Sequence, residues 1–236
     1  MKFTFDAYEK LIELIRKENY IIASYSNYSQ YEKAVIIKHD VDMSLEMAAD
    51  FAEFEKKLGI SSTYNILLCS DFYNPYSKKN MNHILKIFNM GHEIGLHFDE
   101  ARYSEDIIEN INKEIFLLEQ YIGTEIKSFS MHRPSEETLR AEYSLKNGEI
   151  VNTYSRKFFK EFKYISDSRR NWREDPIETI KSGKYSKIHI LTHPIWYSKE
   201  EEEMATRLEL LLSRASKERY DAMTENIRDL ASVIKR

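Results

Sequence analysis

The chain has 236 residues, with 35 basic and 39 acidic side chains and a formal net charge of −4 at pH 7. This length fits one α/β domain with a sizeable core, and the dispersed, nearly balanced charges exclude a nucleic-acid-binding footprint. The segment Met1–Asp6 lacks the apolar region of a secretion signal, and no stretch reaches the ~18 apolar residues of a membrane span. A single cysteine, Cys69, permits no internal disulfide. These features predict a cytoplasmic protein without a membrane span.

Apolar runs typical of β-strands recur along the chain, and helical patterns fill most of the intervals between them. This alternation predicts about seven strand-helix units with a parallel sheet, in a single domain over residues 1–236. The predicted strands are residues 34–39, 62–68, 92–97, 127–132, 149–154, 163–166 and 187–192.

Two kinds of signal predict the helices. Ser44 precedes a stripe of apolar residues at helical spacing that ends at Leu58, and Gly59 follows as a residue suited to a helix end. A second apolar stripe runs through residues 104–122 and predicts a helix packed outside the barrel. From Ser198 onward, apolar residues at helical spacing predict a long or broken terminal helix.

Polar side chains follow the predicted strands where each one ends. Asp40 and Asp42 come at the end of the strand that starts at Ala34, and residues two apart on a strand share a face. Four further strands end in polar groups, namely His97, His132 with Arg133, Asp167 and His193. Because active sites of α/β barrels lie at the carboxyl ends of the strands, the sequence predicts one active site at this mouth.

A pair of aspartates beside histidines suits metal-assisted hydrolysis. One aspartate and the histidines hold a divalent ion, the second aspartate deprotonates water, and a separate histidine protonates the leaving group. Zinc lowers the pKa of its bound water to roughly 7, so hydroxide becomes available at neutral pH. The pattern therefore predicts a divalent metal, with zinc as the first choice.

Five ordered motifs resemble those of the polysaccharide deacetylase family, with its NodB homology domain. They are Asp40-Val41-Asp42, the segment Gly91–His97, Arg133-Pro134, Asp167-Ser168 with Trp172, and Leu191-Thr192-His193. The resemblance implies a distorted (β/α)7 barrel with its motif-bearing part at residues 34–197. It also implies hydrolysis of an N-acetyl or related amide, such as N-formyl, on an amino sugar. The lack of an export signal favours a cytoplasmic glycan precursor, such as a nucleotide-linked or lipid-linked sugar, as the substrate.

The same resemblance implies roles for single residues. By motif match, Asp40 is the general base, Asp42 and His97 are metal ligands, and His193 is the general acid. Arg133 tunes the base and Asp167 holds Arg133. Leu191 lines the pocket for the acyl group. Apart from the resemblance, Trp172 and Trp196 are candidates either to flank a sugar or to cover the mouth of the barrel.

One ligand of the family's metal site is replaced in this chain. Four residues after His97, where the family has its second metal histidine, the sequence has Ala101. His132, at the end of the next strand, ranks first as the substitute, followed by Asp99 and Glu100 in the loop after His97. His92 is excluded because five residues of strand place it ~16 Å from His97 on the opposite face.

Two other functions compete with this hypothesis. A barrel that has lost its metal with the second histidine would only bind a saccharide. Alternatively, the pair Asp40 and Asp42 also resembles the aspartate pairs of some phosphatases and glycosyltransferases, although neither class explains Leu191-Thr192-His193 or Arg133-Pro134.

Overall fold

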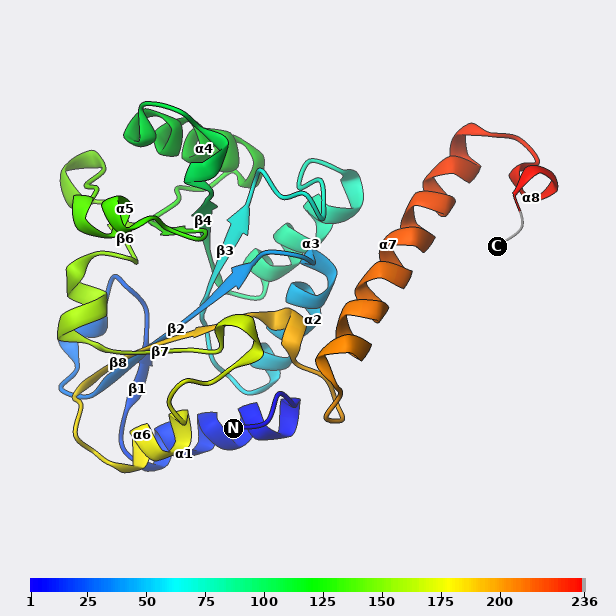
Figure 1. Ribbon diagram of the computed structural model, residues 1–236. Coiled ribbons are helices and arrows are strands. Elements are labelled where there is room, and N and C mark those ends of the chain that lie inside the picture. Colours follow the sequence, from blue (N-terminus) through cyan, green and yellow to red (C-terminus); the bar gives the residue numbers. More distant parts are fainter. Residues whose placement is uncertain (235–236) are drawn as a thin grey trace. The chain divides into compact units, whose positions relative to one another are not determined.

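A parallel, eight-stranded sheet forms the centre of the computed structural model, which describes residues 1–234 (Figure 1). Its strands follow the order β6-β5-β4-β3-β2-β8-β7, and β1 pairs with β2 beside this path. The strands are β1 Ile21–Ala23, β2 Ala34–Val41, β3 Thr63–Leu67, β4 Glu93–Phe98, β5 Ser128–Met131, β6 Val151–Asn152, β7 Lys163–Ser166 and β8 Lys187–Thr192.

All seven predicted strands are present, and the predicted fold class, a distorted (β/α)7 barrel, is confirmed. Each pairing in the sheet is parallel, as expected for strands joined by crossover helices. Within residues 1–234 the edge strands β6 and β7 do not pair with each other, so the curved sheet is an open barrel. The strand β1 was not predicted; it has three residues and pairs with β2.

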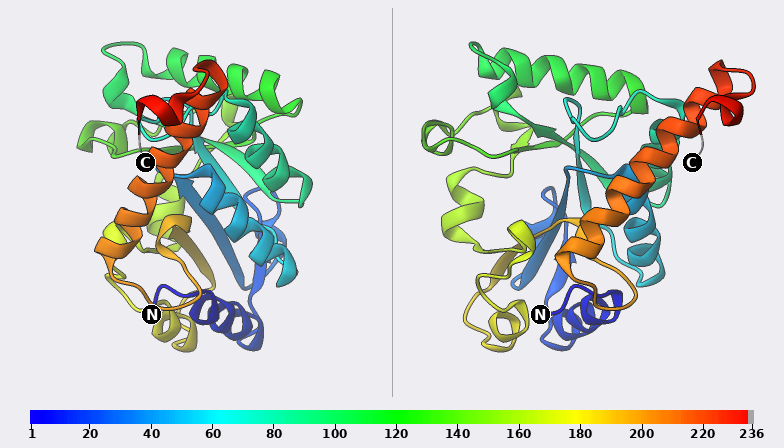
Figure 2. Two further views of the ribbon diagram at one scale, coloured as in Figure 1. Left: turned by 90° about the vertical axis from the view of Figure 1, so that its right-hand side faces the viewer. Right: turned by 45° about the vertical axis from the view of Figure 1, so that its right-hand side comes forward.

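Helices cover the sheet. Figure 2 shows α2 and α3 together against one face of the central strands, while α1 and α6 lie side by side (Figure 1). The helices of this part are α1 Phe5–Lys17, α2 Leu45–Lys57, α3 Lys78–Asn89, α4 Ile107–Ile122, α5 Glu136–Ala141 and α6 Pro176–Lys181. Short helical turns are η1 Tyr28–Gln30, η2 Glu100–Arg102, η3 Lys146–Gly148, η4 Lys157–Glu161, η5 Ser168–Arg170 and η6 Pro194–Trp196.

The predicted ends of α2 agree with the structure. The Ser44 side chain accepts a hydrogen bond from the Met47 N–H at 3.2 Å, which satisfies one of the free donors of the first turn. After the last turn the backbone of Gly59 takes a φ of +67°, a conformation that glycine adopts at little cost.

The register of the sheet places side chains of different strands side by side on the concave face. Asp40 lies opposite Asn65, which lies opposite Gly95, and His97 lies opposite Ser130. Gly95 leaves the room that the Asn65 side chain occupies, because a Cβ at position 95 would overlap Asn65 Oδ1. This layer of polar and small residues lies directly below the ends of the strands.

On the other face of the sheet, a carboxylate is fully buried under α2. Glu55 accepts hydrogen bonds from the hydroxyls of Tyr8, Ser62 and Tyr64 at 2.5, 2.5 and 2.8 Å, and His39 Nε2 lies 3.1 Å away. Burial alone would raise the pKa of Glu55, but His39 and these hydrogen bonds outweigh it and lower the pKa to about 2.

Replacing Glu55 by alanine is therefore expected to lower the free energy of unfolding by about 3–5 kcal/mol, because several buried donors lose their acceptor. Glu53→Ala on the same helix is the control, since the Glu53 side chain is 43 % exposed and its ion pairs with Lys57 and Lys86 lie at the surface. Urea unfolding of both variants measures the difference, and equal midpoints would contradict this account of the network.

Residues from Glu201 onward form a second compact unit, separate from the unit Met1–Glu200. It contains α7 Met204–Asn226 and α8 Leu230–Val233, in agreement with the predicted long or broken terminal helix. That one domain spans all of residues 1–236 remains a prediction. Among the described helices, none combines the length and the apolar character that crossing a membrane requires.

Candidate active site

A cavity of about 580 Å³ lies at the carboxyl ends of the strands. Of the ten residues that the sequence analysis assigns to the site, eight line it. They are Asp40, Asp42, His97, His132, Arg133, Leu191, His193 and Trp196. Four strands far apart in sequence, β2, β4, β5 and β8, thus deliver their terminal side chains to one place, as expected for a parallel barrel.

Three of these side chains converge on one point. His97 Nε2 lies 3.1 Å and His132 Nδ1 lies 3.4 Å from Asp42 Oδ1, and the two nitrogens are 3.1 Å apart. All three potential ligand atoms lie within 4.8 Å of one another. Two imidazole nitrogens and one carboxylate oxygen are a donor set that zinc and similar divalent ions accept in catalytic sites.

The orientation of His97 is set by a chain of hydrogen bonds. The Ser130 hydroxyl donates to Asp40 Oδ1 at 3.1 Å, so its oxygen is free to accept from His97 Nδ1–H at 2.6 Å. With the proton on Nδ1, the lone pair on His97 Nε2 faces Asp42 and His132. Such partners of a ligating histidine fix its tautomer and its ring orientation.

An unsatisfied oxygen shows that the residues present fit a metal ion. Asp42 Oδ1 is buried and has no hydrogen-bond partner, which is costly for a carboxylate unless a cation completes its surroundings. Burial opposes the charged form, but His132 and His97 outweigh it and hold the pKa of Asp42 below its usual value. The carboxylate is therefore ready to bind a cation at neutral pH.

The geometry favours His132 over the two loop carboxylates as the third ligand. Asp99 is engaged by Arg133 Nη2 at 3.2 Å and caps the backbone of Ala101. Glu100 accepts hydrogen bonds from the Ser135 N–H and the Thr138 hydroxyl. Both carboxylates thus have structural partners, whereas His132 points at Asp42.

Asp40 is buried directly beside this cluster. Its Oδ1 accepts from Asn65 Nδ2 at 2.8 Å and from Ser130 at 3.1 Å, and Lys38 Nζ lies 3.2 Å from both carboxylate oxygens. Burial would raise the pKa of Asp40, but the ammonium of Lys38 and the neighbouring His97 lower it to about 2. Asp40 is therefore ionised at neutral pH.

His193 lies at the end of β8, and a buried carboxylate holds it from behind. Asp167 accepts from His193 Nδ1 at 2.6 Å and from the backbone N–H of the same residue at 3.1 Å. Burial disfavours the imidazolium, but Asp167 outweighs it and raises the pKa of His193 to about 9. His193 Nε2 is 3.8 Å from Asp42 Oδ2. This proton-bearing nitrogen therefore faces the group of Asp42, His97 and His132.

The implied roles of Arg133 and Asp167 need correction. The Arg133 side chain is 71 % exposed and pairs with Asp99, and Asp167 binds His193 instead of Arg133. The reason is strand order: β7 pairs with β8, so the residue after β7 lies beside the end of β8. Arg133 itself follows β5 with a φ of +49°, and its exposed side chain borders the cavity next to Asp99.

The two tryptophans lie in different places. Trp196 lines the cavity, whereas Trp172 does not and stacks on Phe3 with ring centroids 6.4 Å apart. The prediction that Trp172 flanks a sugar is corrected accordingly. The loop after β7 brings Arg169 to the cavity, and Tyr154 contributes an aromatic ring from the segment after β6.

Sequence reasoning missed three residues that hold Asp40, namely Lys38, Asn65 and Ser130. One signal was available for Lys38, because it precedes Asp40 by two residues and so shares its face of the strand. Ser130 likewise precedes His132 by two residues. Asn65 could not be assigned, because its approach to Asp40 depends on the pairing of β3 with β2.

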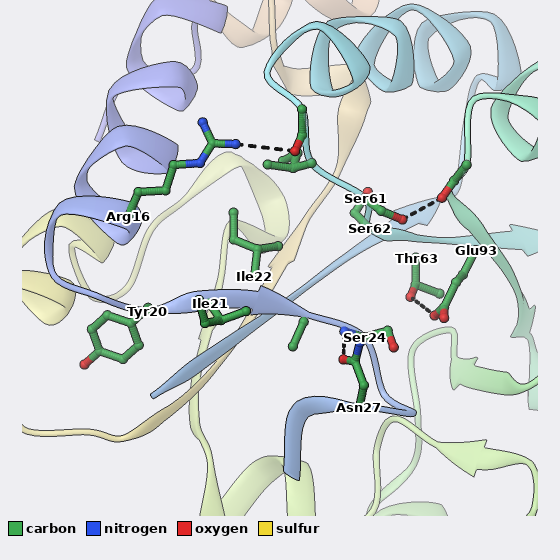
Figure 3. A pocket seen from close by; sticks show the side chains of 14 residues that line it. Arg16, Tyr20, Ile21, Ile22, Ser24, Asn27, Ser61, Ser62, Thr63 and Glu93 are labelled. Atoms are coloured by element: carbon green, nitrogen blue, oxygen red, sulfur yellow. Dashed lines mark hydrogen bonds between the residues drawn. The ribbon is translucent and has the colours of Figure 1, made fainter. Parts of the chain in front are cut away.

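A second cavity of about 460 Å³ lies near the amino ends of β3 and β4, bordered by β1 (Figure 3). Several of its polar side chains have partners within the fold. Ser61 donates to the Gly91 carbonyl at 2.7 Å, and Thr63 donates to Glu93 at 3.0 Å (Figure 3). Its lining contains no group of potential metal ligands, so the cavity at the opposite end is the candidate site.

Comparison with known proteins gives likenesses in structure alone. A scan against known protein families and a search of curated proteins find no match. The chain is similar in fold to carbohydrate deacetylases of known structure. A chitin deacetylase from Colletotrichum lindemuthianum is 12 % identical, with a TM-score of 0.45 over 84 % of this chain and 87 % of that one.

Two further known structures have a comparable sequence identity and TM-score. The peptidoglycan deacetylase PdaC from Bacillus subtilis is 13 % identical, with a TM-score of 0.45 over 84 % of this chain and 96 % of that one. A family 4 acetyl xylan esterase from Clostridium thermocellum, in complex with a cobalt ion, is 16 % identical, with a TM-score of 0.44 over 78 % and 84 %.

Proposed function

We propose that this protein is a metal-dependent hydrolase that removes an N-acetyl or N-formyl group from an amino sugar in glycan biosynthesis. One observation carries the proposal: the cluster of Asp42, His97 and His132 lies between a buried carboxylate, Asp40, and a histidine held by a carboxylate, His193. A metal site flanked by a base and an acid is what hydrolysis of an amide requires.

Asp42, His97 and His132 would hold the divalent ion. When bound, such an ion supplies Lewis acidity, which lowers the pKa of water and polarises the acyl carbonyl. Asp40 accepts the proton of the attacking water, because its carboxylate is ionised and fixed by Asn65 and Ser130. The water oxygen then bonds to the carbonyl carbon.

His193 completes the reaction on the other side of the carbonyl. Its Nδ1–H is held by Asp167, so Nε2–H faces the cavity and donates a proton to the sugar nitrogen as the C–N bond breaks. The products are the free amine and the carboxylic acid. Leu191 and Trp196 give this part of the cavity an apolar wall, which suits the methyl group of an acetyl substituent.

Metal content and turnover test the proposal together. Protein purified without chelator is expected to carry about one divalent ion per chain. It should also release acetate or formate from some member of a panel of N-acylated amino sugars, offered free and nucleotide-linked. Absence of a divalent ion together with saccharide binding would favour the non-catalytic barrel. Phosphate release from sugar phosphates would favour the phosphatase.

The pH profile of kcat/KM is expected to fall as the pH rises through about 9, because the general acid His193 must be protonated and its pKa is raised to about 9. Asp167→Asn removes the main cause of that rise, so the basic limb should move to lower pH. Asp6→Asn is the control, since Asp6 is exposed and paired with Lys10. An unmoved limb in Asp167→Asn would assign that limb to another group.

A further inference from the structure

Lys38 is a fully buried lysine on the concave face of β2. Its side chain has no solvent exposure, and its Nζ lies 3.2 Å from each oxygen of Asp40. Lysine is almost never fully buried without a partner, because removing an ammonium from water is costly. The interactions of the buried ammonium must therefore offset the free-energy cost of its desolvation.

The surroundings direct the ammonium at Asp40. Lys38 lies opposite Thr63 on β3 and Leu191 on β8, and these neighbours carry no charge. On its remaining side, Nζ lies 4.4 Å from the centroid of the Tyr154 ring, a favourable cation-π position. The Asp40 carboxylate and an aromatic face thus hold the ammonium between them.

The hydrogen bonds to Asp40 are unequal between its two oxygens. Oδ1 accepts from Asn65, Ser130 and Lys38, while among residues 1–234 Lys38 alone donates a hydrogen bond to Oδ2. Asn65 and Ser130 anchor one oxygen, and Lys38 fixes the rotation of the carboxylate by binding both. Oδ2 therefore accepts fewer hydrogen bonds than Oδ1, on a residue that lines the cavity.

We propose that Lys38 is the positioning residue for Asp40: it holds the carboxylate so that Oδ2 is presented to the cavity. The role that the motif resemblance implies for Arg133 is thereby taken by a lysine on the same strand as the base. This inference rests on the proposed function, in which Asp40 accepts the proton of the attacking water.

The test is a double-mutant cycle between Lys38→Met and Asp40→Asn. Lys38→Met is expected to lower kcat about 10- to 100-fold with little change in KM or metal content, because a misplaced base costs that much. In the Asp40→Asn background the same change should cost little further, because no carboxylate remains to be positioned. Lys163→Met is the matched control, since Lys163 also pairs with a carboxylate, that of Glu174, and lies over a tyrosine ring, but outside the cavity.

Unfolding in urea measures the coupling between Lys38 and Asp40 without any substrate. Lys38→Met should lower the urea midpoint because it leaves a buried carboxylate without its cation, and adding Asp40→Asn should restore most of the loss. Additive shifts of the midpoint, or a Lys38→Met enzyme with unchanged kcat, would overturn the role of Lys38. If the wild type hydrolyses no acylated amino sugar, the proposed function fails, while the unfolding cycle still decides whether Lys38 holds Asp40.

Discussion

Asp40→Asn and His193→Ala are each expected to lower kcat by roughly 10²–10⁴, because general acid-base groups contribute about that much. Asparagine keeps the shape of Asp40 and the acceptor for Asn65 and Ser130, but it cannot take the proton of the attacking water. His193→Ala removes the donor to the leaving amine. Rates are measured at saturating concentration of a substrate that the wild type hydrolyses.

The metal content of both variants serves as the control for that loss. Neither Asp40 nor His193 belongs to the cluster of converging ligand atoms, so metal analysis should give the wild-type value. Full turnover in both variants would show that the assigned acid and base are wrong, even with the metal in place. Loss of the metal in Asp40→Asn would instead make Asp40 part of the ligand set.

Removal of a metal ligand is expected to abolish metal binding and activity together. Asp42→Ala, His97→Ala and His132→Ala each leave two side-chain donors, and the affinity for zinc should fall by more than the ~10- to 100-fold that changes in the outer partners cause. Ser130→Ala tests that outer partner and should give the smaller loss of zinc affinity, since Ser130 binds His97 and Asp40 but is not itself one of the converging ligands. Calorimetry with zinc measures the series.

Glu100→Gln is the control for this series, because Glu100 lies in the loop that follows His97 but binds Ser135 and Thr138. It should keep wild-type affinity for zinc. If His132→Ala also kept it, the third ligand would have to come from elsewhere in the cavity, with Asp99 as the next residue to replace. Equal and negligible binding by all variants and the wild type would favour the non-catalytic saccharide-binding barrel.

Much of the scaffold could be predicted from the sequence because its signals are local. Seven of the eight strands lie in largely apolar stretches of the sequence, since both faces of a parallel sheet are covered. The shared face of Asp40 and Asp42 follows from the two-residue period of a strand, and so does the placement of His132 beside Ser130. Parallel strands of a barrel end at one mouth, which gathers their terminal side chains without further information.

The partners of these side chains were decided by the tertiary structure. Asp167 binds His193 because β7 pairs with β8, and Asn65 reaches Asp40 because β3 pairs with β2. Arg133 pairs with Asp99 and not with the base Asp40, and no short-range pattern marks the left-handed backbone conformation at Arg133. Strand order and the backbone conformation of loops depend on long-range packing, so the sequence determines which groups meet at the mouth, and the fold determines which of them touch.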